Sequence, residues 1–470
     1  MIHSGSLVSG VGELRQLATV CDGHHNHDMH WFPASVGLMT IRILGRTFEC
    51  LLTGQKKCVR LRSGKRPGAS MAYLAKDDVR DYVHGICFKT GPPGRVGAEA
   101  EWLVTDPHRP DQPVSLNLLS DLVDEAGPPP SGSTVTYEPG GQLELSSPPL
   151  PGPASAHSAL TTDLTHIGKH LHDAGLRLEG LGLDPRRPPT QQLSLPRYAA
   201  MERFFAEGGG ASGRTMMCST ASLQVCVDIG ADPGDAERRW RLAHALGPLL
   251  VAAFANSPIW RGRRTGWRST RWVIWAGIDA SRTRPVPVGD PVDSWTRYAL
   301  DAQLMTIRRD DQPWLCSPGI TFAQWLDSGH PRRPTHDDLV YHLSTLFPPV
   351  RPRGHLELRM IDALPERWWP VPLAVVAALL DDPAATAVAI EATGRLPHGT
   401  APATWRVAAS DALTDPDLAS CARACFAAAS EALGRMGAAR LVPVVDAYRE
   451  RYVERGRCPA DDALTPEGAV

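Results

Sequence analysis

The stretch TVTYEPGGQLELS, residues 134–146, constrains the fold of this chain more than any other part of the sequence. Its two halves alternate between apolar and polar residues, which is typical of short strands, and the Pro-Gly-Gly at 139–141 is typical of a tight turn. The stretch therefore predicts a β-hairpin. Because side chains alternate between the faces of a strand, the length of the turn decides whether Glu138 and Glu144 share one face.

We consider two turn lengths for this hairpin. A three-residue loop pairs Glu138 with Gln142. Thr136 then faces Glu144, and both carboxylates point the same way. A two-residue loop at the two glycines would put the carboxylates on opposite faces, and it would leave the proline, which has no N–H, in a ladder position. We therefore predict the three-residue loop.

Three further stretches show the same alternation, at residues 96–102, 222–228 and 355–359. One face of each is apolar, and the other faces carry Glu99, Glu101, Gln224, Asp228, His355, Glu357 and Arg359. For any one of them, a half-buried strand whose polar face meets water is the ordinary interpretation. We expect all three to be strands.

Taken together, the hairpin and these strands hold five glutamates, no lysine and a single arginine. The glutamates are Glu99, Glu101, Glu138, Glu144 and Glu357. Solvated sheet faces usually mix Thr, Lys and Arg among their acids, and neighbouring carboxylates repel unless a cation lies between them. Hard divalent cations prefer oxygen ligands. The residues therefore predict a carboxylate-lined sheet that holds Mg²⁺ or Mn²⁺, without naming a reaction.

The composition excludes several other classes of function. The chain has 470 residues, of which 43% are hydrophobic and 21% charged, and a net charge of -2, so no strong field favours nucleic acid or an anionic membrane. No P-loop motif, no G-x-G-x-x-G after an expected strand and no apolar run of about 20 residues occurs. The ten cysteines form no C-x-x-C pair. We expect reduced thiols and a cytoplasmic protein.

The domain organisation has three expected parts. We expect residues 1–70 to be a poorly structured extension. Within it, His24-His25-Asn26-His27 is a weak candidate for a metal-binding tract. Met71, which follows the extension, is a possible start. Residues 71–395 form the expected catalytic domain, and 396–470 an Ala-rich helical appendage that braces it. Helices are expected at 77–88, 116–126, 155–174, 196–207, 236–255, 403–413, 417–434 and 438–455, with a kink or a second helix at Pro248.

In order along residues 85–370, several motifs resemble the plant-type glutamate–cysteine ligase family. They are Glu99-Ala100-Glu101, the hairpin YEPGGQLELS, the strand from Met217 to Asp228, GWRSTR at 266–271 with Trp275, Asp279 and Arg282-Thr283, HLSTLFP at 342–348, and Glu357-Leu358-Arg359. The likeness is to the actinobacterial branch that supplies γ-glutamylcysteine for ergothioneine synthesis. In plant relatives, an asparagine usually stands where this chain has Cys226.

The resemblance implies both a fold and a reaction. The implied fold is α+β, a glutamine-synthetase-like core with a curved, mainly antiparallel sheet, a concave active-site face and helices outside. The implied reaction uses ATP and Mg²⁺ to phosphorylate the γ-carboxylate of glutamate, after which the cysteine amine attacks the acyl phosphate.

The resemblance also implies roles for individual residues. The five glutamates match metal-ligand or near-metal positions, and Gln224 and Trp275 match substrate-side positions. Arg271 matches the arginine that holds substrate glutamate. Arg359 matches the arginine that faces the transferred phosphoryl group, with Glu357 beside it in the catalytic machinery.

Two alternatives to this function stay open from the sequence. One is a related carboxylate–amine ligase that joins glutamate to another amine, because the cysteine-binding residues cannot be matched. The other is a metal-dependent hydrolase or a non-catalytic metal-binding relative. No pattern in the sequence indicates an oligomeric state.

Overall fold

The computed structural model describes residues 38–43, 46–51, 73–208, 211–309, 313–314, 319–397 and 399–465. The chain divides into two units, Met1–Ala72 and Tyr73–Val470. In the first unit, β1 (Leu38–Ile43) and β2 (Arg46–Leu51) pair as an antiparallel hairpin. The rest of the expected extension, including its histidine tract, lies outside the described residues.

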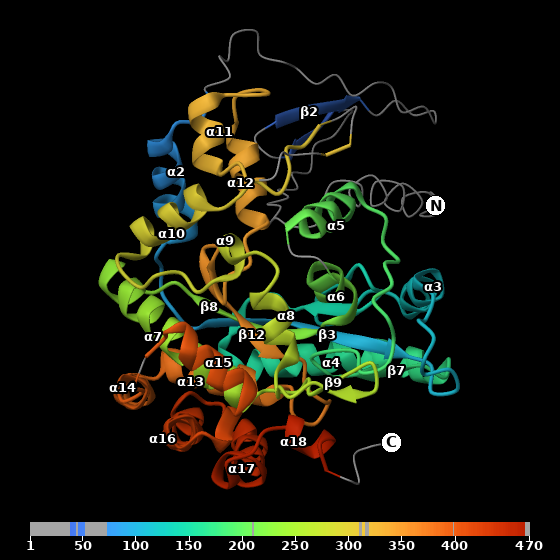
Figure 1. Ribbon diagram of the computed structural model, residues 1–470, viewed down its shortest axis with the longest axis vertical. Helices are drawn as coiled ribbons and strands as arrows, with labels where there is room; N and C mark the ends of the chain where they lie inside the picture. The colour runs from blue at the N-terminus through green and yellow to red at the C-terminus, as the bar shows by residue number, and fades with distance from the viewer. Residues whose placement is uncertain are drawn as a thin grey trace, which may run out of the picture. The chain divides into compact units, whose positions relative to one another are not determined.

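The second unit is built on an eight-stranded sheet (Figure 1) with the order β11-β12-β8-β3-β5-β4, and β6 and β7 also pair with β3. Every pairing is antiparallel. The strands are β3 (Arg95–Thr105), β4 (Thr134–Tyr137), β5 (Leu143–Ser146), β6 (Leu150–Pro151), β7 (Arg177–Glu179), β8 (Ser222–Asp228), β11 (Val350–Pro352) and β12 (His355–Asp362). The expected mixed fold with an antiparallel sheet is confirmed.

The predicted hairpin is present with its three-residue loop. Thr136 faces Glu144 in the register of β4 and β5, and the Glu138 N–H donates to the Gln142 carbonyl at 2.9 Å. Gly141 has a φ of +88°, which favours glycine. A side chain at Gly140 would place its Cβ 2.1 Å from the Cys218 carbonyl oxygen. The two glycines therefore let the loop turn and lie against the segment before β8.

The two faces of the sheet differ as the alternation predicts. Ala98, Ala100 and Trp102 on β3 are buried in the main hydrophobic core, together with Leu223 and Val225 on β8. The opposite face carries the polar residues. One departure occurs in β12, where the register shifts between Leu358 and Ile361. This irregularity turns Asp362 to the polar face, opposite Ser222.

Helices cover the apolar face and form one continuous core with it. They include α4 (Gly152–Asp173), α7 (Pro233–Ala253) and α13 (Pro370–Asp381), which lie on one side of the sheet in Figure 1. The helices expected at 155–174 and 236–255 are confirmed as α4 and α7, whereas α13 was not expected. Helix α7 runs through Pro248, so no second helix starts there. Near the other face lie α5 (Pro196–Gly208), α6 (Ala211–Ser219) and α8 (Thr270–Ala276).

The C-terminal helices pack into the same core. They include α14 (Pro383–Gly394), which was not expected, and α15 (Pro402–Ser410), α16 (Pro416–Arg435) and α17 (Val442–Arg451), which lie close to the expected ranges. The hydroxyl of Tyr448 on α17 donates to the Ala253 carbonyl at the end of α7, at 2.7 Å. These helices therefore support the sheet from its apolar side. The domain limits 71–395 and 396–470 remain a prediction.

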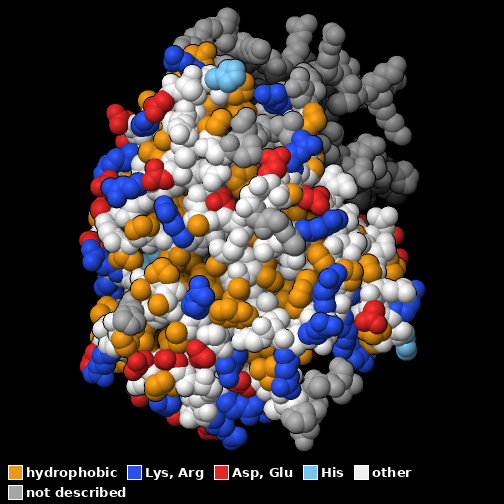
Figure 2. All heavy atoms as spheres, in the orientation of Figure 1, with side chains coloured by type: hydrophobic (Ala, Val, Ile, Leu, Met, Phe, Trp, Pro, Cys, Tyr) orange, Lys and Arg blue, Asp and Glu red, His pale blue; other side chains and the backbone are white. Residues whose placement is uncertain are grey.

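Among the described residues, no single helix is long and apolar enough to span a membrane. Helices α13 and α14 meet those criteria only as a pair, and they are bent by 97° relative to each other. Every residue of α13 from Pro370 to Leu380 is buried within the protein. Figure 2 shows acidic and basic side chains interspersed over the face in view.

We expect the substitution Gly140→Ala to destabilise the protein by roughly 1–3 kcal/mol, the usual cost of forcing extra volume into a packed site. The new Cβ would overlap backbone, which has no rotamer to escape into. Thermal unfolding measures the effect. The matched control is Gly394→Ala at the end of α14, where a Cβ meets no atom within 4 Å. An equal melting temperature for the two variants would contradict the close approach.

Candidate active site

The predicted site residues meet on the polar face of the sheet, in three rows of residues that face one another across neighbouring strands. The rows are Thr136–Glu144–Glu101, Ser146–Glu99–Gln224 and Cys226–Glu357–Arg351. Glu138 follows β4 at the edge of the same face. The sheet thus brings together all five glutamates, although they are spread over nearly 260 residues of sequence.

Hydrogen bonds fix two of the carboxylates. Glu101 accepts from the Ser222 N–H at 2.8 Å and from the Ser222 hydroxyl at 2.9 Å. Glu144 accepts from the Thr136 hydroxyl at 2.7 Å. Gln224 links Glu101 to Arg359: its amide N–H donates to Glu101 at 3.2 Å, and its carbonyl accepts from Arg359. The carboxylates are therefore held in place by the strands that carry them and by their neighbours.

Three of the glutamates are electrostatically strained. Burial, followed by repulsion from Glu357, raises the pKa of Glu99 to about 7. Burial and repulsion from Glu101 raise the pKa of Glu138 to about 8. The pKa of Glu144 is also raised, by burial and by Glu99 and Glu138. Each carboxylate would gain from a nearby positive charge.

Glu357 differs from the other four. It is fully buried, and Arg351 grips it with two parallel hydrogen bonds, Nε to Oε2 at 2.8 Å and Nη2 to Oε1 at 2.9 Å. Arg359 also donates to Oε1. Burial alone would raise the pKa of Glu357, but the attraction of Arg351 and Arg359 outweighs it and lowers the pKa below its usual range.

Arg271 lies beside this group, on α8. Its Nη2 donates to the Arg359 carbonyl at 3.1 Å, its Nη1 is 3.8 Å from the Asp362 carboxylate, and its guanidinium lies 5.4 Å from the centre of the Trp275 ring. Asp362 in turn accepts from the Ser257 and Ser269 hydroxyls at 2.7 and 3.0 Å. Arg271 is therefore braced by the residue that the irregularity in β12 turned inward.

Two arginine nitrogens point to an anionic ligand. The Nε atoms of Arg271 and Arg359 are buried and have no hydrogen-bond partner among the described residues. A buried charged donor without a partner is costly, and a carboxylate or phosphate oxygen would satisfy it. Arg271 and Arg359 can therefore each bind an anion, next to the cluster of glutamates.

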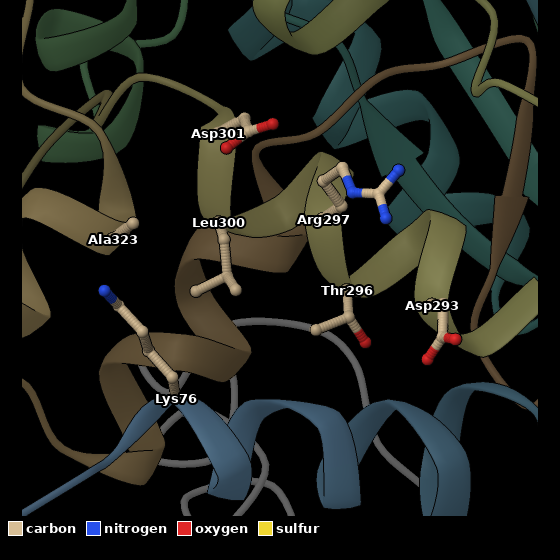
Figure 3. A pocket seen from close by; sticks show the side chains of 7 residues that line it. All are labelled: Lys76, Asp293, Thr296, Arg297, Leu300, Asp301 and Ala323. Carbon is tan, nitrogen blue, oxygen red and sulfur yellow. The ribbon is translucent and has the colours of Figure 1, made fainter.

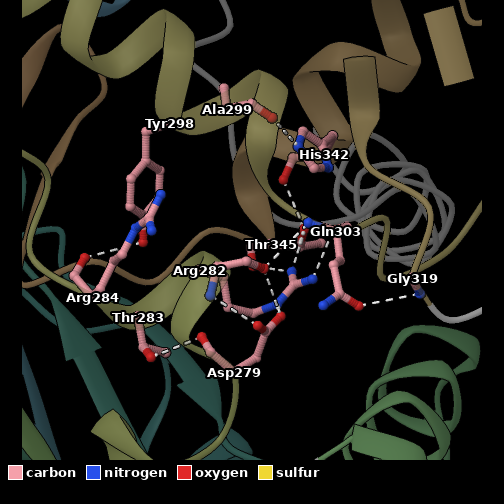
Figure 4. Close-up of polar contacts among 11 residues, drawn as sticks. Asp279, Arg282, Thr283, Arg284, Tyr298, Ala299, Gln303, Gly319, His342 and Thr345 are labelled. Atoms are coloured by element: carbon pink, nitrogen blue, oxygen red, sulfur yellow. Dashed lines mark hydrogen bonds and ion pairs between the residues drawn. The ribbon is translucent and has the colours of Figure 1, made fainter. Parts of the chain in front are cut away.

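Two aromatic side chains, Trp275 and Phe347, form a wall beside these arginines. The Trp275 indole N–H donates to the Phe347 carbonyl at 2.9 Å, and the Phe347 N–H donates to the Arg282 carbonyl at 2.8 Å. Arg282 is fully buried and donates to the carbonyls of Thr345 and Gln303 and to the Asp279 carboxylate (Figure 4). The motif residues Asp279 and Arg282 therefore hold the wall in place.

The donor set suits a hard divalent cation in its chemistry. No group of three or more His, Cys, Asp or Glu side chains in the described part of the chain is arranged to hold a metal as it stands. The raised pKa values of Glu99, Glu138 and Glu144 nevertheless reflect burial and mutual repulsion that the neighbouring groups only partly offset. The fit is one of ligand type and charge, and the metal assignments remain predictions.

A surface hollow of about 380 Å³ lies away from the sheet, between α2 (Lys76–Tyr82), α10 (Pro291–Asp301) and α11 (Phe322–Ser328), as Figure 3 shows. Two of its charged groups already have partners, since Lys76 pairs with Asp327 and Asp293 with Arg80. None of the predicted site residues lines it. It adds nothing to the candidate site.

Comparison with known proteins decides the family. The family profile described as glutamate–cysteine ligase family 2 (GCS2) matches residues 95–469. This chain belongs to the glutamate–cysteine ligase family 2. The expected family and the expected enzyme class, a ligase, are confirmed.

Individual relatives agree with this placement. The glutamate–cysteine ligase EgtA of Mycobacterium tuberculosis is 41% identical over 391 residues, which cover 81% of this chain and 88% of the relative. EgtA of Mycolicibacterium smegmatis is 40% identical over 408 residues, covering 85% and 94%. The chloroplastic glutamate–cysteine ligase of Arabidopsis thaliana is 32% identical over 266 residues, covering 54% and 50%. The longer bacterial matches agree with the branch that the motifs indicated.

Sequence reasoning missed two residues of this ligase site. Arg351 stands in a three-residue strand bounded by prolines, where no alternation can be read. Asp362 lies at an odd spacing from Glu357, so strict alternation assigns it to the apolar face, and the irregularity in β12 reverses that assignment. The high density of arginines at 351–359 was the one available signal for the first.

The strain among the glutamates predicts the effect of Glu144→Gln. The raised pKa means that ionised Glu144 destabilises the fold at neutral pH, so we expect the substitution to raise the melting temperature in a chelator at pH 7–8. The difference should shrink as the pH falls toward the ordinary pKa of a glutamate, where the unfolded chain also binds the proton. Turnover should fall by at least about 100-fold, because a charged oxygen is lost.

Calorimetry and a ligase assay measure these two effects. The control is Glu237→Gln on α7, an exposed glutamate paired with Arg241, which should change neither property appreciably. A melting temperature lowered by Glu144→Gln would show that the cluster is not repulsive.

Proposed function

We propose that this ligase joins the γ-carboxylate of glutamate to the amine of cysteine with ATP, through γ-glutamyl phosphate. The product is γ-glutamylcysteine, and the proposed pathway is ergothioneine synthesis. One observation carries the proposal: in a chain of this family, two buried arginines with unpaired Nε atoms lie beside buried glutamates whose mutual repulsion is only partly offset. Such a site can gather several anions that would otherwise repel one another.

The chemistry explains why those parts are needed. A carboxylate is a poor electrophile, because its leaving group would be oxide. Phosphorylation replaces that leaving group with phosphate, at the cost of bringing the negative charges of ATP and glutamate together. Fixed positive charges that face the transferred group stabilise the charge that develops.

The proposed metal site consists of Glu99, Glu101, Glu138, Glu144 and Glu357. These residues would hold Mg²⁺, or Mn²⁺, which when bound supplies positive charge to the phosphate oxygens. Glu101 and Glu144 are already oriented by hydrogen bonds to Ser222 and Thr136. Gln224 links Glu101 to Arg359, so it ties the carboxylate side of the site to the phosphoryl side.

The proposed substrate contacts lie on the arginine side. Arg359 faces the transferred phosphoryl group from β12. Arg271 grips the α-carboxylate of glutamate with its planar fork, which a lysine could not reproduce. The centre of the Trp275 ring lies 5.4 Å from the guanidinium of Arg271 and 5.6 Å from that of Arg359. The ring therefore limits how far the two guanidinium groups can turn.

Three broader features belong to the same proposal. The antiparallel sheet with one polar face and helices behind the other supports a glutamine-synthetase-like core. The absence of a single membrane-spanning helix among the described residues accords with a cytoplasmic enzyme of small-molecule substrates. The domain limits 1–70, 71–395 and 396–470 are retained in it.

Oxygen tracing tests the proposed mechanism. If a γ-carboxylate oxygen attacks the γ-phosphorus of ATP, that oxygen leaves with phosphate when the amine attacks. Glutamate labelled with ¹⁸O in its γ-carboxylate should therefore pass one labelled oxygen into inorganic phosphate for each peptide bond. Mass spectrometry of the phosphate measures the transfer.

The control reaction uses unlabelled glutamate in H₂¹⁸O and should give unlabelled phosphate. A hydrolase would give the opposite pattern, with label from water and none from glutamate. Replacing cysteine with other amines in the same assay separates cysteine from other acceptors. Unlabelled phosphate from labelled glutamate would rule out the acyl phosphate.

A second experiment tests the glutamate contact. Arg271→Lys keeps the charge but loses the fork, so we expect the KM for glutamate to rise about 10- to 100-fold, the equivalent of one charge-assisted hydrogen bond. The KM for ATP should change little. The matched control is Arg268→Lys, three residues away, which pairs with Asp461 and the Ser410 carbonyl outside the site. A change confined to the KM for ATP would reassign Arg271 to the nucleotide.

A further inference from the structure

Arg351 uses its guanidinium differently from the other arginines of the site. Its Nε and Nη2 donate to the two oxygens of Glu357 at 2.8 and 2.9 Å, and its Nη1 donates to the Leu346 carbonyl at 3.2 Å. Each of its three nitrogens therefore donates within the protein. The residue is 6% exposed.

The contrast with Arg359 and Arg271 is direct. Both of those residues keep a buried Nε that has no partner among the described residues, so each has a donor for a ligand. Arg351 has its fork filled by Glu357. It is suited to hold a protein group in place and not to bind substrate.

The carboxylate of Glu357, which Arg351 holds, also contacts Arg359 and so influences its orientation. Oε1 of Glu357 accepts from Arg351 Nη2 and also from Arg359 Nη1. The bidentate grip sets the plane of the carboxylate, and so sets where Oε1 lies for Arg359. The Leu346 contact ties the same guanidinium to the segment that carries Phe347, whose ring centre lies 6.0 Å from the Arg359 guanidinium.

We propose that Arg351 is a positioning residue for phosphoryl transfer: through Glu357 and the segment at Leu346, it fixes the direction in which Arg359 presents its guanidinium. This inference rests on the proposed function. Without the fork, Glu357 keeps its charge but can rotate, and Arg359 follows it. Glutamate binding by Arg271 is unaffected, because Arg271 is braced separately by Asp362.

The test compares two lysine substitutions with matched surroundings. Arg351→Lys keeps the charge and removes the bidentate geometry. The control is Arg239→Lys on α7, which is also buried and also uses all three nitrogens. They donate to the Asp228 and Leu380 carbonyls and to Asp381 at 3.0, 2.8 and 2.7 Å. Both variants should lose thermal stability.

Only Arg351→Lys should change the reaction. We expect kcat to fall at least about tenfold with the KM for glutamate within twofold, because an interaction with the transferred phosphoryl group is lost and ground-state binding of glutamate is kept. Calorimetric titration with ATP alone should also show weaker binding than in the Arg239→Lys protein. Equal kcat and equal ATP affinity in the two variants would overturn the proposal.

A double substitution shows whether Arg351 acts through Glu357. In a Glu357→Gln background, Arg351→Lys should lower the residual rate by less than twofold, since its target is already altered. Multiplicative losses would overturn the proposal. If Arg351→Lys fails to fold, Arg351→Gln serves in the same cycle. Absence of ligase activity in the unaltered protein would instead count against the proposed function.

Discussion

Repulsion among carboxylates on one sheet face is the constraint on which the rest of this structure depends. Glu99, Glu138 and Glu144 all have raised pKa values because they are buried beside one another. A fold can keep such a cluster together only if its backbone is held by other interactions. Here the opposite face of the same strands supplies them, through Ala100, Trp102 and the other apolar residues of the core.

The helices behind the sheet provide that rigidity. Helix α13 is buried along its whole apolar length, and α17 is joined to α7 through the Tyr448 hydroxyl. The C-terminal helices therefore stabilise the sheet that carries the site, although none of the predicted site residues lies on them. Their burial in the core that they share with the sheet contributes stability that offsets the cost of the repelling carboxylates.

The sequence predicts the parts of the site that follow from local rules. The Pro-Gly-Gly loop sets the hairpin register, and alternation then places Glu99, Glu101 and Glu144 on one face. What it misses depends on contacts between distant strands. The position of Asp362 on the polar face depends on the register shift in β12. The pairing of Glu357 with an arginine depends on Arg351 from β11. The roles of these residues come from a family resemblance, because periodicity cannot supply them.

The arginines of the site are distinguished by how many of their donors the protein already uses. The chain has six lysines, none after Lys169, so the cations of β11, β12 and α8 are all arginines. An arginine whose fork is filled, such as Arg351, behaves as part of the scaffold. One with a buried Nε left over, such as Arg271 or Arg359, keeps a donor that a bound anion can satisfy. Because charge is the same in all three, saturation of the donors separates the residue that positions from the residues that bind.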